Sequence, residues 1–252
     1  MQENAPRVKT TQTSFRIIEA IRDHPGIGVS ELSREIVLSK SAVYKHLQTL
    51  VSMNYLVREN DGYYLSNQFL SLGIRARERF PLDTAKRVVG DLADTTGHIT
   101  NFVVHENAQG VYALRVKPAE FASDSVTEGD AVPLHATAGG KAILAFFSAE
   151  KRAEILDESD LQEYTEKTIT DRNTLEQELQ SVRDRRVAFD REEYLDGHQC
   201  VASPVVNSDG EPVAAVSVTG NIEQMSGKRL EVDVTGLVAS AAKSIQKDLL
   251  SK

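Results

Sequence analysis

A glycine-rich run at 138–142, Ala-Gly-Gly-Lys-Ala, has the residue types of a loop that binds phosphate groups. A P-loop requires glycine where this chain has His135, and serine or threonine where it has Ala142. The run therefore argues against nucleotide hydrolysis. A helix that begins at small residues still presents backbone N–H groups, which bind a ligand carboxylate well. We expect Ala138 and Gly139 to lie at such a helix start.

Cys200 is the single cysteine of the chain and follows His198 by two residues. Alternate residues of a strand share a face, so the pair could form a thiol nucleophile. No Asn or Asp stands at a spacing that would orient the histidine, and a lone cysteine on a strand is typical of packing. The six histidines show no metal-ligand spacing. We expect no catalytic residues, no metal and no cofactor, and zinc bound by Asp190, Cys200 and a histidine is the alternative.

Ser217 and Thr219 stand two residues apart in a segment that is otherwise Val and Ala. Residues at this spacing lie on one face of a strand. Two hydroxyl groups on an apolar face either hydrogen-bond locally or line a pocket. Periodicity alone leaves both readings open.

Residues 29–65 have the pattern of a winged helix-turn-helix. Ser30 and Ser39 are predicted N-caps of two short helices, of which the first turns Leu32 and Ile36 inward. The second buries a stripe of apolar residues at positions 43, 47 and 50 and leaves a polar face for bases and phosphates. A small helical bundle with no DNA to bind is the alternative. The side chains that we expect to contact DNA are Ser39, Lys40, Ser41, Tyr44, Lys45 and Gln48 of the second helix and Arg58 of the wing.

The wing is predicted as two strands, 55–58 and 63–65, around the turn Glu-Asn-Asp-Gly at 59–62. We expect Asp61-Gly62 to supply the positive φ that such a turn needs.

Charge divides the chain of 252 residues in two. Residues 1–80 hold 11 Lys/Arg against 8 Asp/Glu, whereas residues 81–252 hold 18 against 29. The basic excess coincides with the predicted helix-turn-helix, and an acidic remainder would be repelled by DNA. One cysteine excludes an internal disulfide framework, and no apolar run reaches 18 residues. We expect a cytoplasmic protein that does not enter a membrane.

Helical and strand patterns alternate along the rest of the chain, which predicts an α+β fold. A first helix at 10–23 should turn Phe15, Ile18 and Ile21 inward. Helices are also predicted at 67–80, 83–96, 135–147, 148–156, from 171 onward and at 229–250, and strands at 98–105, 111–116, 200–206 and 212–219. The last helix should pack through Val234, Leu237, Ala241, Ile245 and Leu249. Because strands arrive as hairpins, the sheet should be largely antiparallel.

Five runs, in this order and spacing, resemble the IclR family of transcriptional regulators over nearly the whole chain: 38–50, 133–145, 168–171, 187–205 and 216–220. The resemblance implies a winged helix-turn-helix domain at 1–66, a helical linker at 67–80 that makes dimers, and a GAF-like α/β domain at 81–252 for effector binding and oligomerisation. It also implies that the effector site comprises Ala138, Gly139, Asp190, Cys200, Ser217 and Thr219.

The chain departs from the family pattern at four positions. Val37 and Asn54 stand where glycine is usual, and a β-branched residue disfavours positive φ. Lys45 replaces an arginine, so an ammonium group with a single centre of charge stands where a guanidinium could make two parallel hydrogen bonds. Thr219 replaces a serine and keeps the hydroxyl.

Together these features predict a DNA-binding transcriptional regulator that responds to a small molecule. The expected partners are a palindromic double-stranded operator, a small polar or carboxylate metabolite, and a second copy of the chain in a homodimer or dimer of dimers. Asp190 favours a hydroxylated acid over a plain dicarboxylate. The alternatives are a small-molecule-metabolising enzyme fused to a DNA-binding domain, and an architectural DNA-binding protein without an effector.

Overall fold

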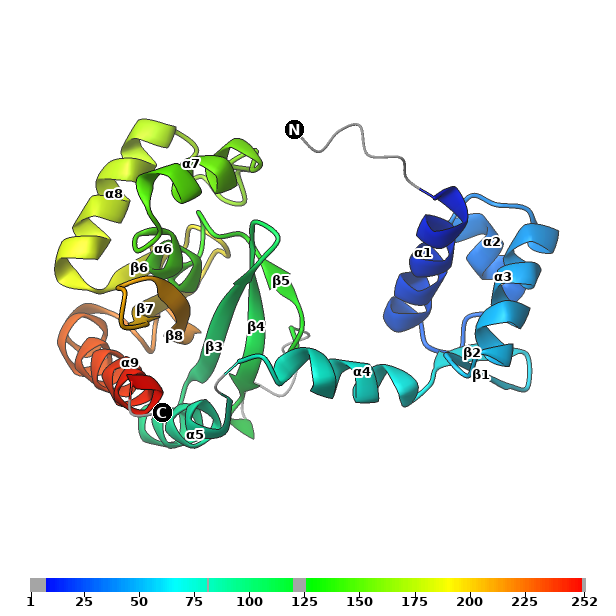
Figure 1. The fold of residues 1–252 in the computed structure, drawn as a ribbon, viewed down its shortest axis with the longest axis horizontal. Helices are drawn as coiled ribbons and strands as arrows, with labels where there is room; N and C mark the ends of the chain where they lie inside the picture. The colour runs from blue at the N-terminus through cyan, green and yellow to red at the C-terminus, as the bar shows by residue number, and fades with distance from the viewer. Residues whose placement is uncertain (1–7, 81, 120–125, 251–252) are drawn as a thin grey trace. The chain divides into compact units, whose positions relative to one another are not determined.

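The computed structural model describes residues 8–80, 82–119 and 126–250. It divides into two compact units, Met1–Arg79 and Phe80–Lys252 (Figure 1). The α+β class predicted from the sequence is confirmed. No helix among the described residues is long and apolar enough to cross a membrane.

The first unit is a three-helix domain with a two-stranded wing, followed by one further helix. Its elements are α1 (Lys9–Asp23), α2 (Val29–Glu35), α3 (Lys40–Ser52), β1 (Leu56–Glu59), β2 (Gly62–Leu65) and α4 (Gln68–Arg77). Ile17, Leu32, Leu47 and Tyr63 are fully buried between the helices and the wing. This core orients α3 so that one of its faces stays in solvent.

Two details of this unit correct the sequence predictions. Phe15 is 55% exposed, because the inward stripe of α1 runs through Ile17, Ala20 and Ile21, and a residue two places before Ile17 lies roughly 200° around the helix. The N-cap of α2 is Gly28 and not Ser30. The carboxylate of Glu31 accepts from the Gly28 N–H at 3.4 Å. The helix therefore begins two residues earlier than predicted.

Among the described residues of this unit that are not glycine, Val37 (56°), Asn54 (63°) and Asn60 (52°) hold positive φ. The positive φ of the wing turn therefore lies at Asn60, and the prediction of Asp61-Gly62 was wrong. Gly62 is needed for space, since a Cβ there would lie 2.6 Å from the carbonyl oxygen of Gly26.

The second unit is built on a six-stranded antiparallel sheet with the order β5-β4-β3-β8-β7-β6. Its strands are β3 (Ile99–Glu106), β4 (Gln109–Val116), β5 (Ala131–Val132), β6 (Ala188–Arg191), β7 (His198–Val206) and β8 (Pro212–Asn221). The short edge strands β5 and β6 were not predicted. They are four residues or fewer, too short for a period-2 pattern to be recognised.

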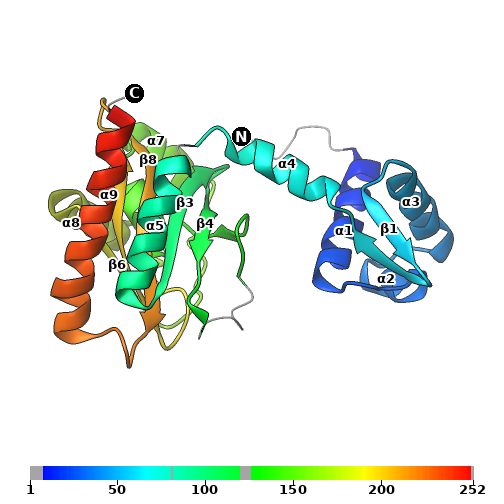
Figure 2. The same cartoon turned by 90° about the horizontal axis from the view of Figure 1, so that it is seen from below.

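Helices cover both faces of this sheet (Figures 1 and 2). One face carries α5 (Leu82–Thr96) and α9 (Thr235–Leu250), and the other carries α6 (Ala138–Leu144), α7 (Ala149–Asp157) and α8 (Arg172–Arg185). The α6 face is the one on which Cys200 and Ala202 lie.

Two helices differ from their predicted form. α6 begins at Ala138 with Thr137 as its N-cap, and not at His135. The segment predicted as one helix from 229 begins with a π-helical turn, Arg229–Val234. Val234, Ala241 and Ile245 are buried as predicted, but Val238 is buried in the place predicted for Leu237, which is exposed.

Candidate functional sites

The first candidate site is the solvent face of α3. All six predicted contact residues of this region, Ser39, Lys40, Ser41, Tyr44, Lys45 and Gln48, are exposed, as is Arg58 of the wing. The opposite face of α3 buries Val43, Leu47 and Leu50, as predicted. The predicted N-cap Ser39 is confirmed, because its hydroxyl accepts from the Ala42 N–H at 3.3 Å. The helix thus presents a continuous polar and basic face.

Two contacts fix α3 relative to the rest of its domain. Ser14 Oγ of α1 lies 2.9 Å from His46 Nδ1 of α3. Arg16 Nη2 donates to the carbonyl oxygen of Ile36 at 2.9 Å, in the turn between α2 and α3. The arginine thereby supports the turn that contains Val37. Sequence analysis missed Arg16, since a charged residue on an exposed helix face carries no pattern that identifies its partner.

Arg58 stands on the wing, apart from α3 in sequence. Its Nη2 lies 3.7 Å from Asp61 Oδ1, and its guanidinium carbon lies 5.9 Å from the centre of the Tyr63 ring. Asp61 is fully exposed, so the ion pair is weak and leaves Arg58 available to a phosphate.

The second candidate site is a row of polar side chains across the α6 face of the sheet, which we call the polar row: Arg115, Asn101, Ser217, Thr219, Cys200 and Asp190. These residues lie opposite one another on five neighbouring strands, β4, β3, β8, β7 and β6. Arg115 Nη1 donates to Asn101 Oδ1 at 2.5 Å, and Asn101 Nδ2 donates to Ser217 Oγ at 3.1 Å and to Thr219 Oγ1 at 3.4 Å. Thr219 Oγ1 donates to Cys200 Sγ at 3.2 Å.

The thiol of Cys200 is inert in this setting. Burial raises the pKa of Cys200 to about 12, so the sulfur keeps its proton at neutral pH. The ring of His198 contacts the carbonyl oxygen of Asp196 through Nδ1, at 3.1 Å. A thiol nucleophile activated by His198 gains no support from this geometry.

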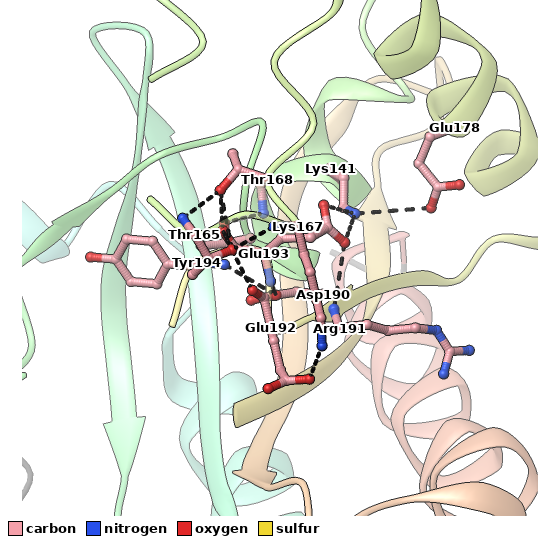
Figure 3. Close-up of polar contacts among 12 residues, drawn as sticks. Lys141, Thr165, Lys167, Thr168, Glu178, Asp190, Arg191, Glu192, Glu193 and Tyr194 are labelled. Carbon is pink, nitrogen blue, oxygen red and sulfur yellow. Dashed lines mark hydrogen bonds and ion pairs between the residues drawn. The ribbon is translucent and has the colours of Figure 1, made fainter. Parts of the chain in front are cut away.

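Asp190 ends the polar row on β6, beside a buried ion pair (Figure 3). Its Oδ1 accepts from the backbone N–H of Glu193 at 2.7 Å and of Tyr194 at 3.4 Å. Burial raises the pKa of Asp190 to about 7. Lys141, only 1% exposed, donates from Nζ to both carboxylate oxygens of Glu193, at 2.6 and 2.7 Å. This pair ties α6 to the loop that follows Asp190.

Threonine hydroxyls hold the same loop from its other side (Figure 3). Thr168 Oγ1 donates to the carbonyl oxygen of Glu193 at 2.6 Å, and Thr165 Oγ1 donates to that of Glu192 at 2.6 Å. The loop backbone is therefore fixed, and with it the two N–H groups that Asp190 accepts from.

Ala138 and Gly139 form the first turn of α6, directly on the sheet. A Cβ on Gly139 would lie 2.9 Å from Val103 Cγ2, so a larger residue would have to displace the Val103 side chain. Thr137 caps the helix by accepting from the Gly140 N–H at 3.2 Å. Of the predicted effector residues, the structure brings Asp190, Cys200, Ser217 and Thr219 into one row, and it places Ala138 in the same apolar cluster as Cys200. Gly139 lies against Val103 of β3.

A cleft of about 380 Å³ opens between the β3–β4 hairpin, the segment after β5 and the loop after α7. Tyr164 and Tyr194 stand in its wall with ring centres 5.1 Å apart. Since the N–H of Tyr194 donates to Asp190, this cleft borders the polar row. Among the described residues, no three His, Cys, Asp or Glu side chains come together as a metal site requires.

Asn101 and Arg115 were missed by sequence analysis. Each is a polar residue in a predicted strand of Phe, Val and Leu, which is a signal that a polar group faces a site. Their partnership with Ser217 depends on strand order, and the order β4-β3-β8 joins segments more than a hundred residues apart.

Comparisons with known proteins agree for both units. Residues 12–60 match the model of the IclR helix-turn-helix domain, and residues 82–247 match the model of the bacterial transcriptional regulator IclR C-terminal domain. The chain is 30% identical over 240 residues to the HTH-type transcriptional regulator KdgR of Escherichia coli, covering 91% of this chain and 88% of that protein. It is 26% identical to the probable regulator ArcR of Halobacterium salinarum, with 95% and 93% covered.

Solved structures with the same fold include the IclR of Thermotoga maritima, at a TM-score of 0.81 and 29% identity, which covers 96% of this chain and 99% of that one. An IclR homolog from Microbacterium hydrocarbonoxydans, complexed with 4-hydroxybenzoate, has a TM-score of 0.78 and 21% identity, with 96% and 100% covered.

Proposed function

Because this chain belongs to the IclR family of bacterial transcriptional regulators, we propose that the α3 face binds an operator and that a small molecule bound at the polar row changes that binding. The proposal assigns DNA binding to residues 1–66, a linking helix to 67–80, and effector binding and oligomerisation to 81–252. It places the protein with its DNA in the cytoplasm.

The DNA-binding part of the proposal rests on one observation: α3 has a buried apolar face and an exposed polar face. In this proposal Lys40, Ser41, Tyr44, Lys45 and Gln48 enter the major groove, Ser39 contacts a phosphate at the helix start, and Arg58 contacts a phosphate beside the wing. One recognition helix reads few base pairs, so we propose a palindromic operator bound by two copies of the chain.

The test of this part is a double variant, Lys40→Ala with Lys45→Ala. It should lower operator affinity by about 10-fold or more and reduce the slope of log K against log salt by about 1–2. The measurement is fluorescence anisotropy on a duplex selected from random sequences by the wild-type protein. A matched control is Lys243→Ala with Lys247→Ala on α9, which should leave affinity unchanged. Equal operator binding by the α3 variant and the wild type would refute the assignment.

The observation that carries the effector part is the polar row. The proposed site comprises Asp190, Cys200, Ser217 and Thr219, with Ala138 and Gly139 at the adjacent helix start, and Asn101 added from the structure. The Ser217 hydroxyl as a donor at one end of the row and the Asp190 carboxyl as an acceptor at the other favour a hydroxy acid as the ligand. The neighbour of similar fold that holds 4-hydroxybenzoate carries a ligand of this class.

We also propose that the protein is not an enzyme. The protonated thiol of Cys200 supports this, since a thiol nucleophile must be a thiolate. Turnover of a small molecule that binds the second unit would contradict it.

A further inference from the structure

The hydrogen bonds of the polar row have a fixed direction, which starts at Arg115. A guanidinium group donates and never accepts, so the amide atom of Asn101 that faces Arg115 must be the carbonyl oxygen Oδ1. The amide nitrogen of Asn101 is then turned to β8 and donates to Ser217 Oγ and Thr219 Oγ1. Arg115 thus decides which way this amide points.

The direction continues through the two hydroxyl groups. Each accepts from Asn101 with an oxygen lone pair, so its own proton points elsewhere. Thr219 donates its proton to Cys200 Sγ. The proton of Ser217, which accepts from Asn101, is the one directed to the side of the row away from Asn101.

Burial and strand pairing keep this arrangement in place. Asn101 is fully buried and Ser217 is 2% exposed, so water does not compete for these bonds. Asn101 lies directly opposite Arg115 on β4 and opposite Ser217 on β8. The Arg115 guanidinium carbon also lies 4.9 Å from the centre of the Tyr112 ring, a cation–π contact that fixes the side chain.

We propose that Arg115 is a positioning residue that sets effector specificity: through Asn101 it makes Ser217 a hydrogen-bond donor, so the effector presents a carboxylate to this hydroxyl. This inference rests on the proposed effector site. Asp190 ends the row with the opposite polarity, as an acceptor, which suits a hydroxyl of the same molecule. The ligand class is a hydroxycarboxylic acid whose carboxylate lies over β8 and whose hydroxyl lies toward β6.

The test uses matched pairs that differ only in the carboxylate: lactate and 1,2-propanediol, gluconate and sorbitol, 4-hydroxybenzoate and 4-hydroxybenzyl alcohol. Calorimetry on the full chain should show at least one acid binding the wild type about 10-fold or more tightly than its alcohol. Arg115→Met removes the donor and frees the Asn101 amide to turn its oxygen toward Ser217. This variant should lose the preference for the acid by about 10-fold, whereas Arg115→Lys, which still donates to Oδ1, should keep it.

The ratio of acid to alcohol affinity separates positioning from a structural role, since loosening of the sheet would weaken both ligands alike. Arg87→Gln, on the exposed surface of α5, is the control and should leave the ratio unchanged. If Arg115→Met does not fold, Ser217→Ala removes the hydroxyl donor directly and should lose the same preference.

Two results would overturn the inference: no acid of the three binds the wild type at millimolar concentration, or the acid preference survives in Arg115→Met, or in Ser217→Ala where Arg115→Met does not fold. Operator affinity, measured in the same preparations, separates this failure from failure of the proposed function. If an alcohol changes operator affinity as strongly as its acid does, the result is consistent with the proposed effector site but refutes the role of Arg115.

Discussion

Val37 holds a backbone conformation that favours glycine, and its side chain is 83% exposed. An L-residue in the left-handed region costs about 1–2 kcal/mol, and burial of the side chain does not offset this cost here. Glycine costs roughly 0.5–1 kcal/mol more in unfolded-chain entropy. Val37→Gly should therefore stabilise the first unit by about 0.5–1 kcal/mol, seen as a higher unfolding temperature.

The matched control for this prediction is Val57→Gly in β1, a partly exposed strand residue without positive φ. It should lower the unfolding temperature. If Val37→Gly lowers it as well, the strain attributed to the turn is absent.

Asp190 should make the stability of the second unit depend on pH. Its pKa is raised by burial from 3.8 to about 7 in the folded protein, so its contribution is fully present below pH 3.8 and is lost as pH rises through about 7. The loss is on the order of 3 kcal/mol between about pH 4 and pH 7. Asp190→Asn keeps an acceptor for the Glu193 N–H and should remove this dependence.

Thermal unfolding of both proteins from about pH 5 to pH 8 measures the effect. Asp171→Asn is the control: hydrogen bonds from Thr174 lower the pKa of Asp171, so its contribution is lost only as pH falls below 3.8. Parallel stability curves for Asp190→Asn and the wild type would contradict the raised pKa.

At the scale of elements, α4 exposes apolar side chains to solvent. Leu70 and Ile74, four residues apart on one helix face, are 64% and 53% exposed, and no residue of α4 is buried. We propose that this face packs against α4 of a second copy. Leu70→Ser with Ile74→Ser should weaken self-association by about 10-fold or more, since each buried Leu or Ile contributes about 1.5–3 kcal/mol.

Sedimentation at micromolar concentration compares this variant with the wild type. Val232→Ser, an exposed apolar residue of the second unit, should leave association unchanged. A wild-type protein that is monomeric on and off DNA would refute the role of α4.

Elements with a long periodic stripe and a clear cap could be predicted from the sequence. α3 and α8 have both, with Ser39 and Asp171 as caps. Elements set by tertiary packing could not be predicted in the same way. The N-cap of α2 involves the Glu31 carboxylate, which accepts from the Gly28 N–H. The π-helical turn before the last helix leaves no mark in the spacing of apolar residues, and β6 is recognised only by its pairing with β7.

The candidate sites divide in the same way. The exposed face of α3 follows from helical periodicity, and the effector residues follow from the family resemblance. The partnership of Asn101 with Ser217 requires the strand order β3-β8, and the Lys141–Glu193 pair requires the packing of α6 on the sheet. Neither sequence spacing nor charge pattern contains this information.

At the scale of the whole molecule, the chain joins a basic DNA-binding unit to an acidic ligand-binding one. A ligand alters operator binding only if it binds the operator-bound and free states with different affinity. Such coupling is typically 1–3 kcal/mol, or about 5–150-fold, and it must be reciprocal.

The most direct test is therefore the operator affinity of the full chain, measured by anisotropy with and without a saturating hydroxy acid from the panel above. We expect a change of about 5–150-fold, and an equal change in acid affinity when the operator is saturating. Ser217→Ala should bind the operator as tightly as the wild type does without ligand, and should require more acid for the same change. An operator affinity that is unaltered by an acid that saturates the polar row would contradict the account.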